Sequence, residues 1–491
     1  MILTRRLYRQ LKDLLDNRRQ LLTIVGIVFI LTAIPITVSL LRQEPKLSSQ
    51  AAANTLTVGS GSYTTIQAAV NAANSGDIVR VLAGVYNEQV SVTKPLTLLG
   101  ETGAVIDGQC SRQFGVLIGT PGVSGVVVQD FEVRNTRGSG VRIENDDDVS
   151  MSQAPRTITI DDNYIHDFYC AGGEPFGVAG VSSWYGGPNI TITDNVIKYR
   201  GALSDTASGQ RSDADGIFFG STNARPSGGG HYVARNRIVG GWDGLGGGDE
   251  AEAAGTLHKN STVEDNVIMT CDDDGMQIEG GGENVRIRNN TISGCLIGIA
   301  IASPQTGPTY VEGNVISGLL NACYKVGNGP GTGVTYLTGN RCTGPKGMQQ
   351  TDPNHSSLVL RQNCWQVGGY IFELPYGPTS GLDFDEDVMY STGPPFKWNG
   401  GVTYGSLAAF QSATGQEQSG TWQQSSDCSV LGPPTQPSTK VGDINGDSSI
   451  NILDLSVLLT KWGTSDTMAD LDKSGKVDII DLSILLTKWG T

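Results

Sequence analysis

The sequence is short of charge, and most of the charge that it has is negative. Only 17% of the residues are charged, and 49 acidic against 34 basic residues give a net charge of −15. Phosphate backbones repel a chain this acidic, which excludes nucleic acid as a partner. Only four histidines are present, and His166 and His355 each stand alone, as solvated or turn residues do.

Long apolar runs are also absent, apart from one near the N-terminus. Residues 21–41 carry no charge and are long enough to span a bilayer. Six basic residues precede this run against two acidic ones, so the positive-inside rule places residues 1–20 in the cytoplasm and the bulk of the chain outside. We therefore expect a membrane anchor, followed by a linker over residues 42–54. Cleavage of a signal peptide near residues 51–53 is the alternative, and it would release a secreted protein.

Glycine and asparagine dominate what is present. The chain has 66 glycines in 491 residues, as expected for a turn-rich all-β protein. Asparagine recurs in short strand-like phrases such as DDNYI, TDNVI and EGNVI, at Asn135, Asn163, Asn195, Asn236, Asn266, Asn290, Asn314, Asn340 and Asn363. The last four intervals are 24, 24, 26 and 23 residues, about the length of one turn of a stacked β-coil.

This repeat predicts a solenoid, in which each coil covers the apolar face of the next one. An asparagine at the same corner of every coil can bond along the stack and satisfy backbone groups that the turn leaves unpaired. We interpret the asparagines as a structural ladder. The pattern resembles right-handed parallel β-helix proteins of the pectate-lyase-like superfamily, and the resemblance implies an all-β parallel β-helix over residues 55–431.

A short helix is expected before the first full coil. Apolar residues recur at helical spacing over residues 66–73, with Thr64 or Thr65 as N-cap and Gly76 as the stop. Such a helix would cover the open end of the solenoid, where unpaired strand edges otherwise invite aggregation.

The eight cysteines are compatible with an oxidising compartment. Cys271 and Cys295 each lie five residues after a ladder asparagine and are 24 residues apart. They should therefore lie on adjacent coils, within reach of a disulfide. Buried free thiols at these positions are the alternative.

The C-terminus carries a duplicated pattern of oxygen-bearing side chains. Residues 443–463 recur at residues 470–490 with an offset of 27. Each half matches positions 1, 3, 5, 9 and 12 of a twelve-residue calcium loop. The predicted Ca²⁺ ligands are Asp443, Asn445, Asp447, Asn451, Asp454, Asp470, Asp472, Ser474, Asp478 and Asp481.

The duplication, together with Asp in place of Glu at position 12, resembles dockerin domains. The resemblance implies a small α-helical, calcium-binding module over residues 441–491 and a cohesin-bearing scaffold protein as its partner. A Pro/Thr-rich stretch over residues 432–440 is typical of a linker, and we expect it to connect this module to the solenoid.

A groove is predicted where the coils lengthen. The intervals between ladder asparagines rise to 32, 41 and 30 residues over residues 163–266, so extra loops leave the coils there. Loops on a rigid solenoid are the usual place for binding. In and just after this region Asp215, Asp243 and Asp274 each precede a glycine and an apolar residue. If the coils are in register, these carboxylates form a column with about 5 Å between layers.

A carboxylate column has two chemical uses, although Asp-Gly is also ordinary turn chemistry. Close carboxylates cannot all ionise cheaply, so a general acid can coexist with a general base, as glycoside hydrolysis requires. Alternatively the column holds Ca²⁺, and a basic residue abstracts a proton from an acidic sugar in β-elimination. The catalytic candidates are Asp215, Asp243, Asp273 and Asp274. The candidates for substrate contacts are Trp184, Tyr185, Trp242, His231, His258, Glu279, Arg286 and Arg288.

Three functions remain open. A β-helix groove, an acidic patch and a dockerin belong together in polysaccharide breakdown, so the resemblance implies a cell-surface hydrolase or lyase with a polysaccharide substrate. The second is a non-catalytic polysaccharide-binding or adhesive module displayed through the dockerin. The third is a structural surface protein in which the solenoid is a spacer.

Overall fold

The computed structural model describes most of the solenoid and part of the C-terminal module. The described residues are 53–119, 122–145, 150–170, 177–199, 214–221, 225, 227–247, 256–278, 280, 282–302, 306–327, 331–351, 353, 357–377, 380–424, 442, 444, 450, 454–455, 458–459, 461–464, 469, 471 and 476–489. The predicted anchor at residues 21–41 and the predicted linker at residues 432–440 lie outside them. Within the described part, no helix combines the length and the apolar character that crossing a bilayer requires.

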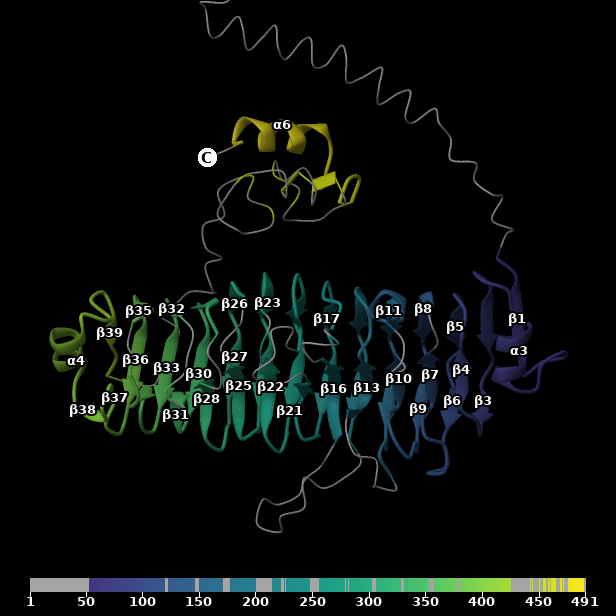
Figure 1. The fold of residues 1–491 in the computed structure, drawn as a ribbon, viewed down its shortest axis with the longest axis horizontal. Helices are drawn as coiled ribbons and strands as arrows, with labels where there is room; N and C mark the ends of the chain where they lie inside the picture. Colours follow the sequence, from purple (N-terminus) through teal and green to yellow (C-terminus); the bar gives the residue numbers. More distant parts are fainter. Residues whose placement is uncertain are drawn as a thin grey trace, which may run out of the picture. The chain divides into compact units, whose positions relative to one another are not determined.

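The chain winds through three sheets in turn, and each sheet has 13 strands (Figure 1). Neighbouring strands of successive coils are parallel, and the last pair of the third sheet, β37 (Phe396–Trp398) with β38 (Val402–Tyr404), is antiparallel. The predicted parallel β-helix is therefore confirmed.

Sheet A consists of β1 (Thr55–Val58), β2 (Ile78–Val81), β5 (Thr97–Gly100), β8 (Ser124–Gln129), β11 (Arg156–Asp161), β14 (Ile190–Thr193), β17 (Tyr232–Ala234), β20 (Thr262–Glu264), β23 (Val285–Arg288), β26 (Thr309–Glu312), β29 (Val334–Thr338), β32 (Ser357–Arg361) and β35 (Leu382–Asp385). Sheet B consists of β3 (Gly84–Tyr86), β6 (Ala104–Asp107), β9 (Glu132–Arg134), β12 (Tyr164–His166), β15 (Val196–Lys198), β18 (Arg237–Val239), β21 (Val267–Met269), β24 (Thr291–Ser293), β27 (Val315–Ser317), β30 (Arg341–Gly344), β33 (Cys364–Val367), β36 (Val388–Ser391) and β39 (Thr421–Trp422). Sheet C consists of β4 (Val90–Val92), β7 (Val116–Gly119), β10 (Val141–Glu144), β13 (Val178–Trp184), β16 (Ala214–Gly220), β19 (Leu245–Gly246), β22 (Asp274–Ile278), β25 (Ile297–Ala302), β28 (Ala322–Gly327), β31 (Lys346–Gln350), β34 (Phe372–Leu374), β37 (Phe396–Trp398) and β38 (Val402–Tyr404). A 3-10 turn, η1 (Met151–Gln153), precedes β11.

The predicted asparagine ladder runs along the corner between sheets A and B. From Asn163 to Asn340, the backbone N–H and the side-chain Nδ2 of each ladder residue both donate to Oδ1 of the next, at 2.9–3.1 Å. These side chains are at most 2% exposed. The ladder thus satisfies buried polar groups that water cannot reach.

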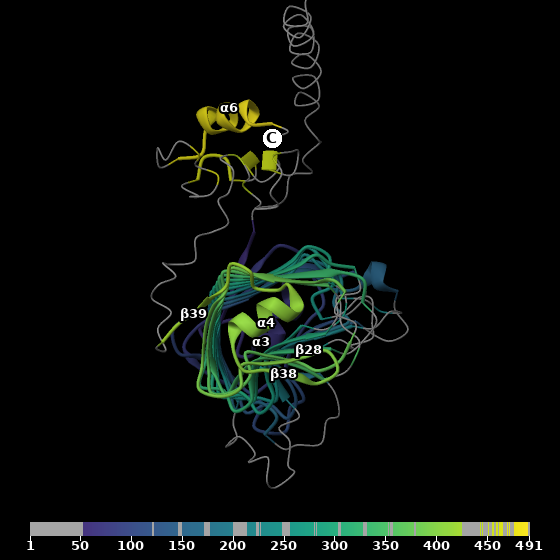
Figure 2. The same ribbon diagram turned by 90° about the vertical axis from the view of Figure 1, so that its left-hand side faces the viewer.

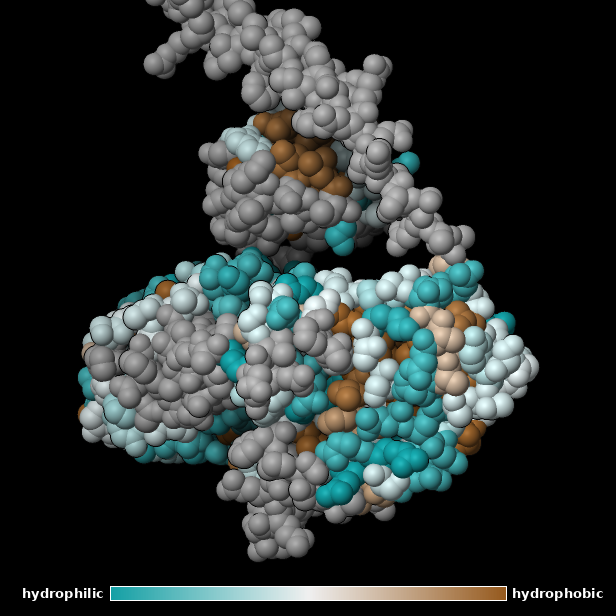
Figure 3. Space-filling model, turned by 45° about the vertical axis from the view of Figure 1, so that its right-hand side comes forward, coloured by the Kyte–Doolittle hydropathy of each residue, from teal (hydrophilic) through white to brown (hydrophobic). Residues whose placement is uncertain are grey.

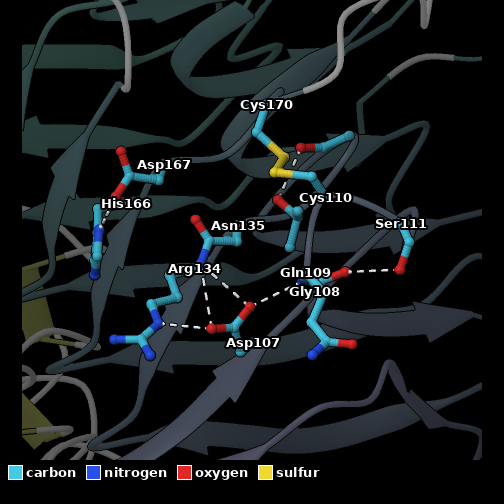
Figure 4. The surroundings of a disulfide bond; sticks show 12 residues. Asp107, Gly108, Gln109, Cys110, Ser111, Arg134, Asn135, His166, Asp167 and Cys170 are labelled. Carbon is cyan, nitrogen blue, oxygen red and sulfur yellow. Dashed lines mark hydrogen bonds and ion pairs between the residues drawn. A yellow bond between two sulfur atoms is a disulfide. The ribbon is translucent and has the colours of Figure 1, made fainter.

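One of the nine asparagines does not belong to the ladder. In the coil of β9 the ladder position is occupied by Phe131, whose backbone N–H donates to Asn163 Oδ1 at 3.1 Å. Asn135 follows the end of β9 with a φ of 52°, and its Nδ2 lies 3.2 Å from both carboxylate oxygens of Asp107 (Figure 4). The prediction was wrong here because it used spacing alone. Asn135 precedes Asn163 by about the length of one coil, but it follows its sheet B strand, β9, whereas Asn163 precedes its sheet B strand, β12.

Acidic residues end the ladder. Asp387 Oδ1 accepts from the backbone N–H and Nδ2 of Asn363 at 2.8 and 3.1 Å, and its Oδ2 accepts from Trp365 Nε1 at 2.7 Å. The backbone N–H of Asp387 donates to Glu417 Oε2 at 3.3 Å. A carboxylate suits the last position because it accepts these bonds without adding a donor that needs a partner of its own.

Short helices close both ends of the solenoid. At the N-terminal end, α3 (Ile66–Ala72) is capped by Thr65 and buries Ile66, Ala69 and Val70, as predicted. At the other end, α4 (Leu407–Thr414) crosses the cross-section of the coils (Figure 2), and Phe410 stacks on Phe396 with ring centroids 4.3 Å apart. The helices cover strand edges that would otherwise offer unpaired backbone groups.

Disulfides connect different coils of the solenoid. The predicted bond between Cys271 and Cys295 is present, and further bonds join Cys110 to Cys170 (Figure 4) and Cys323 to Cys342. Cys364 is disulfide-bonded as well. The alternative of buried free thiols at Cys271 and Cys295 is therefore wrong, and the bonds suit an oxidising compartment.

The C-terminal module has a small core of its own. Its described buried residues are Ile444, Ile450, Leu458, Ala469, Val477 and Leu485. The helix α6 (Ile479–Thr487) begins with a capping box between Asp478 and Asp481.

Replacing Glu417 with Gln should remove a pH dependence of the C-terminal end. Burial and the neighbouring charge of Asp387 raise the pKa of Glu417 to about 10, so its contribution to stability is full below about pH 4.5 and is lost as the pH rises toward about 10. Relative to the variant, we expect the wild type to lose up to about 1.4 kcal/mol of unfolding free energy per pH unit across this window. Urea unfolding followed by tryptophan fluorescence measures the difference.

The matched control is Glu386→Gln, because Glu386 is exposed at the neighbouring corner position. This variant should keep the wild-type pH dependence. The same pH dependence in the wild type and in Glu417→Gln would contradict the assignment.

Candidate functional site

Three aspartates stack where the chain enters sheet C. Asp215 lies in β16, Asp243 precedes β19, and Asp274 begins β22. The backbone N–H of Asp243 donates to Asp215 Oδ1 at 3.0 Å, and that of Asp274 donates to Asp243 Oδ1 at 2.9 Å. The residues are 8%, 2% and 0% exposed, in chain order. The carboxylate column expected from coil register is present, and we call these three residues the Asp ladder.

The glycine after each of these aspartates has a packing role. A Cβ on Gly216, Gly244 or Gly275 would lie 2.3–2.4 Å from Cγ2 of an isoleucine of sheet B and 2.5–2.6 Å from the carbonyl oxygen of the next glycine. The same column of glycines includes Gly180 and Gly298, which no aspartate precedes. The fold therefore accounts for the glycines of the Asp-Gly pairs but not for the aspartates.

Lys325 contacts the Asp ladder, although the sequence does not single it out. Its Nζ lies 3.0 Å from Asp274 Oδ2 across 51 residues of sequence. The outward-facing positions Gln277, Ala300 and Lys325 are in register on β22, β25 and β28. A lysine within a strand has the sequence signature of any solvated strand residue, so only the stacking of the coils reveals this contact.

Burial and electrostatic repulsion raise pKa values within the Asp ladder. Burial raises the pKa of Asp215 to about 7 from its usual 3.8. Burial first, and then the charges of Asp215 and Asp274, raise the pKa of Asp243 well above its usual range. Asp274 has the Lys325 ammonium group as a counter-charge. The ladder therefore combines a carboxyl group whose pKa is raised, Asp243, with a carboxyl group that is paired with an ammonium group, Asp274.

Asp273 brings a fourth carboxylate to the site. It is half-buried, and carboxylate oxygens of Asp243, Asp273 and Asp274 lie within 4.8 Å of one another. Oxygens this close suit the calcium alternative as well as acid–base chemistry. The position of Lys325 favours acid–base chemistry, because its ammonium group already provides the positive charge beside Asp274.

Two of the aromatic candidates form a cluster on sheet C, beside the Asp ladder. Trp184 ends β13, and its ring stacks on that of Phe218 with centroids 5.9 Å apart. The guanidinium of Arg142 lies 4.8 Å from the Trp184 ring centroid, and Tyr185 packs against Trp184 at 4.8 Å. Phe218 is in register with Gly246, so the cluster borders the Asp ladder.

The third aromatic candidate adjoins the ladder directly. Trp242 immediately precedes Asp243 in the chain, and its backbone N–H donates to Ala214 O at 2.8 Å.

The arginine candidates lie on another face of the coil. Arg286 and Arg288 belong to β23 in sheet A. Arg286 lies 3.7 Å from Glu312, and Arg288 lies 2.5 Å from Glu264. The structure therefore does not bring these arginines to the Asp ladder.

The histidine candidates lie in turns that lead into sheet A. His231 is 2% exposed, and its Nε2 lies 2.6 Å from Ser227 Oγ. Burial lowers the pKa of His231 to about 3, so the ring stays neutral. His258 Nδ1 lies 2.5 Å from Ser227 O. The remaining candidate, Glu279, is outside the described residues.

An open cavity of about 640 Å³ lies at the corner between sheets A and B, near the N-terminal coils. Its acidic and aromatic lining comprises Glu101, Asp130, Glu132, Asp162, Phe131 and Tyr164. Burial and the charge of Asp162 raise the pKa of Asp130. The lining shares no residue with the Asp ladder, so this cavity is a separate feature.

Three of the ten predicted calcium ligands are described. Asp454 Oδ1 accepts from the backbone N–H of Ile444 at 2.7 Å, and Asp478 and Asp481 form the capping box of α6. Asp454 and Asp481, which occupy position 12 of the two loops, are 0% exposed. Buried carboxylates facing the loop backbone fit a calcium loop. Asp443, Asn445, Asp447, Asn451, Asp470, Asp472 and Ser474 lie outside the described residues.

Two families match parts of the sequence. Residues 114–343 match the family described as right handed beta helix region, and residues 441–488 match the dockerin type I domain. No curated protein sequence matches the chain.

Several solved structures resemble the solenoid. The alginate lyase from Paenibacillus sp. str. FPU-7 is 14% identical, with 62% of this chain and 96% of that chain covered at a TM-score of 0.34. The family 28 exopolygalacturonase of Yersinia enterocolitica is 10% identical, with 71% and 77% covered at a TM-score of 0.38. PfbA, a surface adhesin of Streptococcus pneumoniae, is 10% identical, with 67% and 83% covered at a TM-score of 0.35. No conclusion about activity follows from similarities at this level.

The two glycines that flank Leu245 should respond differently to substitution by alanine. A Cβ on Gly244 would lie 2.3 Å from Ile268 Cγ2 and 2.6 Å from a backbone oxygen, whereas one on Gly246 would lie 3.0 Å from Asp215 Oδ2 and Asp243 Oδ2, which can shift. We expect Gly244→Ala to cost about 1–3 kcal/mol of unfolding free energy or more, and Gly246→Ala to cost less than about 1 kcal/mol. Thermal unfolding followed by circular dichroism measures both. Equal losses would show that the glycine column does not shape this part of the fold.

Proposed function

Because this chain is a parallel β-helix protein with a C-terminal dockerin domain, we propose that it is a carbohydrate-active cell-surface protein that hydrolyses a polysaccharide at the Asp ladder. In this proposal residues 55–431 form the solenoid, residues 432–440 the linker and residues 441–491 the dockerin. Residues 1–20, 21–41 and 42–54 serve as cytoplasmic segment, membrane anchor and linker, or are removed with a signal peptide.

The observation that carries the proposal is the stacking of Asp243, a buried carboxyl group with a raised pKa, on Asp274, whose carboxylate is paired with Lys325. Glycoside hydrolysis needs one carboxylic acid to protonate the leaving oxygen and one carboxylate on the other side of the bond. Asp243, with its raised pKa, suits the first role. Asp274, paired with Lys325, and the half-buried Asp273 suit the second, which is to activate water or stabilise the developing positive charge. Asp215 adds to the repulsion that keeps the proton on Asp243.

The positions of the basic candidates favour hydrolysis over elimination. β-Elimination needs a base beside the sugar and a cation on its carboxylate. Arg286 and Arg288 lie on sheet A in pairs with acidic residues, and the buried His231 lies in a turn leading into that sheet. Lys325 lies beside the ladder, but it is engaged with Asp274.

Aromatic rings beside the ladder suit a sugar substrate. In the proposal Trp184, Tyr185 and Trp242 provide apolar surface for pyranose rings, which present flat C–H faces. Arg142 stacks on Trp184 and would hold the orientation of its ring.

A specific observation favours a second function, which is binding without cleavage. The Asp ladder repeats the hydrogen bonding of the asparagine ladder, with a side-chain oxygen accepting from a backbone N–H of the neighbouring coil. All three of its residues are at least nine-tenths buried. On this reading the aspartates are structural, and the solenoid binds or displays polysaccharide.

The dockerin supports display outside the cytoplasm through a cohesin-bearing partner. Apolar side chains gather on the surface of the C-terminal module (Figure 3), and the exposed ones are Leu459, Trp462, Ile479, Ile480, Leu486 and Trp489. An exposed apolar patch on so small a module is typical of a protein interface. We propose that this surface contacts cohesin and that Ca²⁺ in both loops holds it in shape.

Substitution of Asp243 and Asp274 tests the hydrolase. We expect Asp243→Asn and Asp274→Asn in the full chain to lower the release of reducing ends from a panel of neutral and acidic glycans by about 100-fold or more, because each removes an acid or base. Asp265→Asn is the matched control, since Asp265 lies at an exposed corner. Unsaturated chain ends would indicate elimination, retention without cleavage would support the second function, and full activity in both variants would refute the role of the ladder.

Calcium and surface substitutions test the dockerin. We expect the C-terminal module to lose helical circular dichroism in EDTA and to regain it with Ca²⁺, because the loop ligands repel one another without the ion. Ile480→Asp should abolish calcium-dependent capture by a panel of cohesins, whereas Ser483→Asp, also exposed on α6, should retain it. The cohesin assignment fails if no cohesin captures the wild type in the presence of Ca²⁺.

A further inference from the structure

An ion pair connects the Asp ladder to a lysine two coils further along. Lys325 Nζ lies 3.0 Å from Asp274 Oδ2, and the two side chains are 22% and 1% exposed. Solvent screens such a pair only weakly, so each charge has a strong effect on the other. A lysine that served only solubility would extend into solvent instead.

The outer face of sheet C lets Lys325 reach back toward β22. Lys325 is in register with Ala300 of β25, and Ala300 is in register with Gln277 of β22. The methyl group of Ala300 is small enough for the lysine side chain to pass over β25.

Among the residues that the structure describes, four carboxyl groups and the Lys325 ammonium group lie close to this point. Asp215 and Asp243 belong to the preceding coils, Asp273 precedes Asp274 in the chain, and Lys325 approaches from β28. The ammonium group is paired with Asp274, while burial and the charges of Asp215 and Asp274 raise the pKa of Asp243.

We infer that Lys325 is a positioning residue that keeps Asp274 ionised and oriented, so that the proton of the Asp ladder resides on Asp243. The inference rests on the proposed function, in which Asp243 is the acid and Asp274 acts as a carboxylate. No bond forms or breaks at Lys325 itself. The lysine distinguishes two aspartates that otherwise stand in equivalent positions on adjacent coils.

Lys325→Met in the full chain tests the role through the pH profile of glycan cleavage. Removal of the opposite charge at this distance should raise the pKa of Asp274. The acid limb of the kcat profile should therefore shift by at least about one pH unit to higher pH, with a smaller change in KM. Lys325→Arg should restore the profile. Lys397→Met, which removes a lysine paired with Glu373 on the same sheet, should leave the profile unchanged.

The pH dependence of unfolding provides a readout that needs no substrate. In Lys325→Met, Asp274 must bind a proton to stay buried, so the urea midpoint should fall relative to the wild type as the pH rises from about 4 to about 7. Adding Asp274→Asn to this variant should abolish the fall, because the carboxylate that is paired with Lys325 in the wild type is then removed as well.

Failure of this inference differs from failure of the proposed function. If the wild type cleaves no glycan, the proposed hydrolase is wrong, and the unfolding readout alone decides the role of Lys325. If Asp274→Asn is inactive while Lys325→Met keeps the wild-type pH profile and urea midpoint, the inference is overturned and the hydrolase stands. Cleavage that EDTA removes, Ca²⁺ restores and Lys325→Met leaves unchanged would also overturn it.

Discussion

Each coil of this solenoid presents the same corner to its neighbour, and the backbone groups at that corner are shut away from water. The buried side-chain amides from Asn195 to Asn363 satisfy these groups, because each Oδ1 accepts two hydrogen bonds from the preceding coil. The requirement persists where the asparagines stop, and Asp387 and Glu417 take over as acceptors. Because the coils are aligned at this corner, the rest of each coil is also in register, and each side chain stacks on the equivalent side chain of the next coil.

The Asp ladder applies the same bonding rule to a different side chain, with different electrostatic consequences. An amide is neutral and both donates and accepts, so a column of asparagines has no net charge. A column of carboxylates repels itself and is stable only when protons or cations compensate it. Here the raised pKa of Asp243, which favours its protonated form, and the ammonium group of Lys325 provide that compensation. An arrangement that keeps one acid neutral beside one ionised carboxylate is also the arrangement that acid–base chemistry uses.

The two parts of the chain solve the problem of exposed apolar surface in opposite ways. The solenoid closes both of its ends, with α3 at one and α4 at the other. The C-terminal module leaves Ile479, Ile480 and Trp489 at least 42% exposed. The first arrangement prevents association along the axis of the coils, and the second favours a partner on one defined surface.

Features that repeat along the chain could be predicted without coordinates, because repetition at coil length reports which residues stack. The β-helix, eight of the nine ladder asparagines, the bond between Cys271 and Cys295 and the alignment of the Asp ladder all follow from that spacing. The expectation failed at Asn135, which has the right spacing along the sequence but lies at another point of the coil. It also missed Asp387, which is not an asparagine but accepts the same hydrogen bond from the preceding coil. The pairing of Lys325 with Asp274 lay beyond any local pattern. It depends on a long side chain crossing a neighbouring strand, and only stacked coils bring residues that are 51 apart in sequence to 3.0 Å.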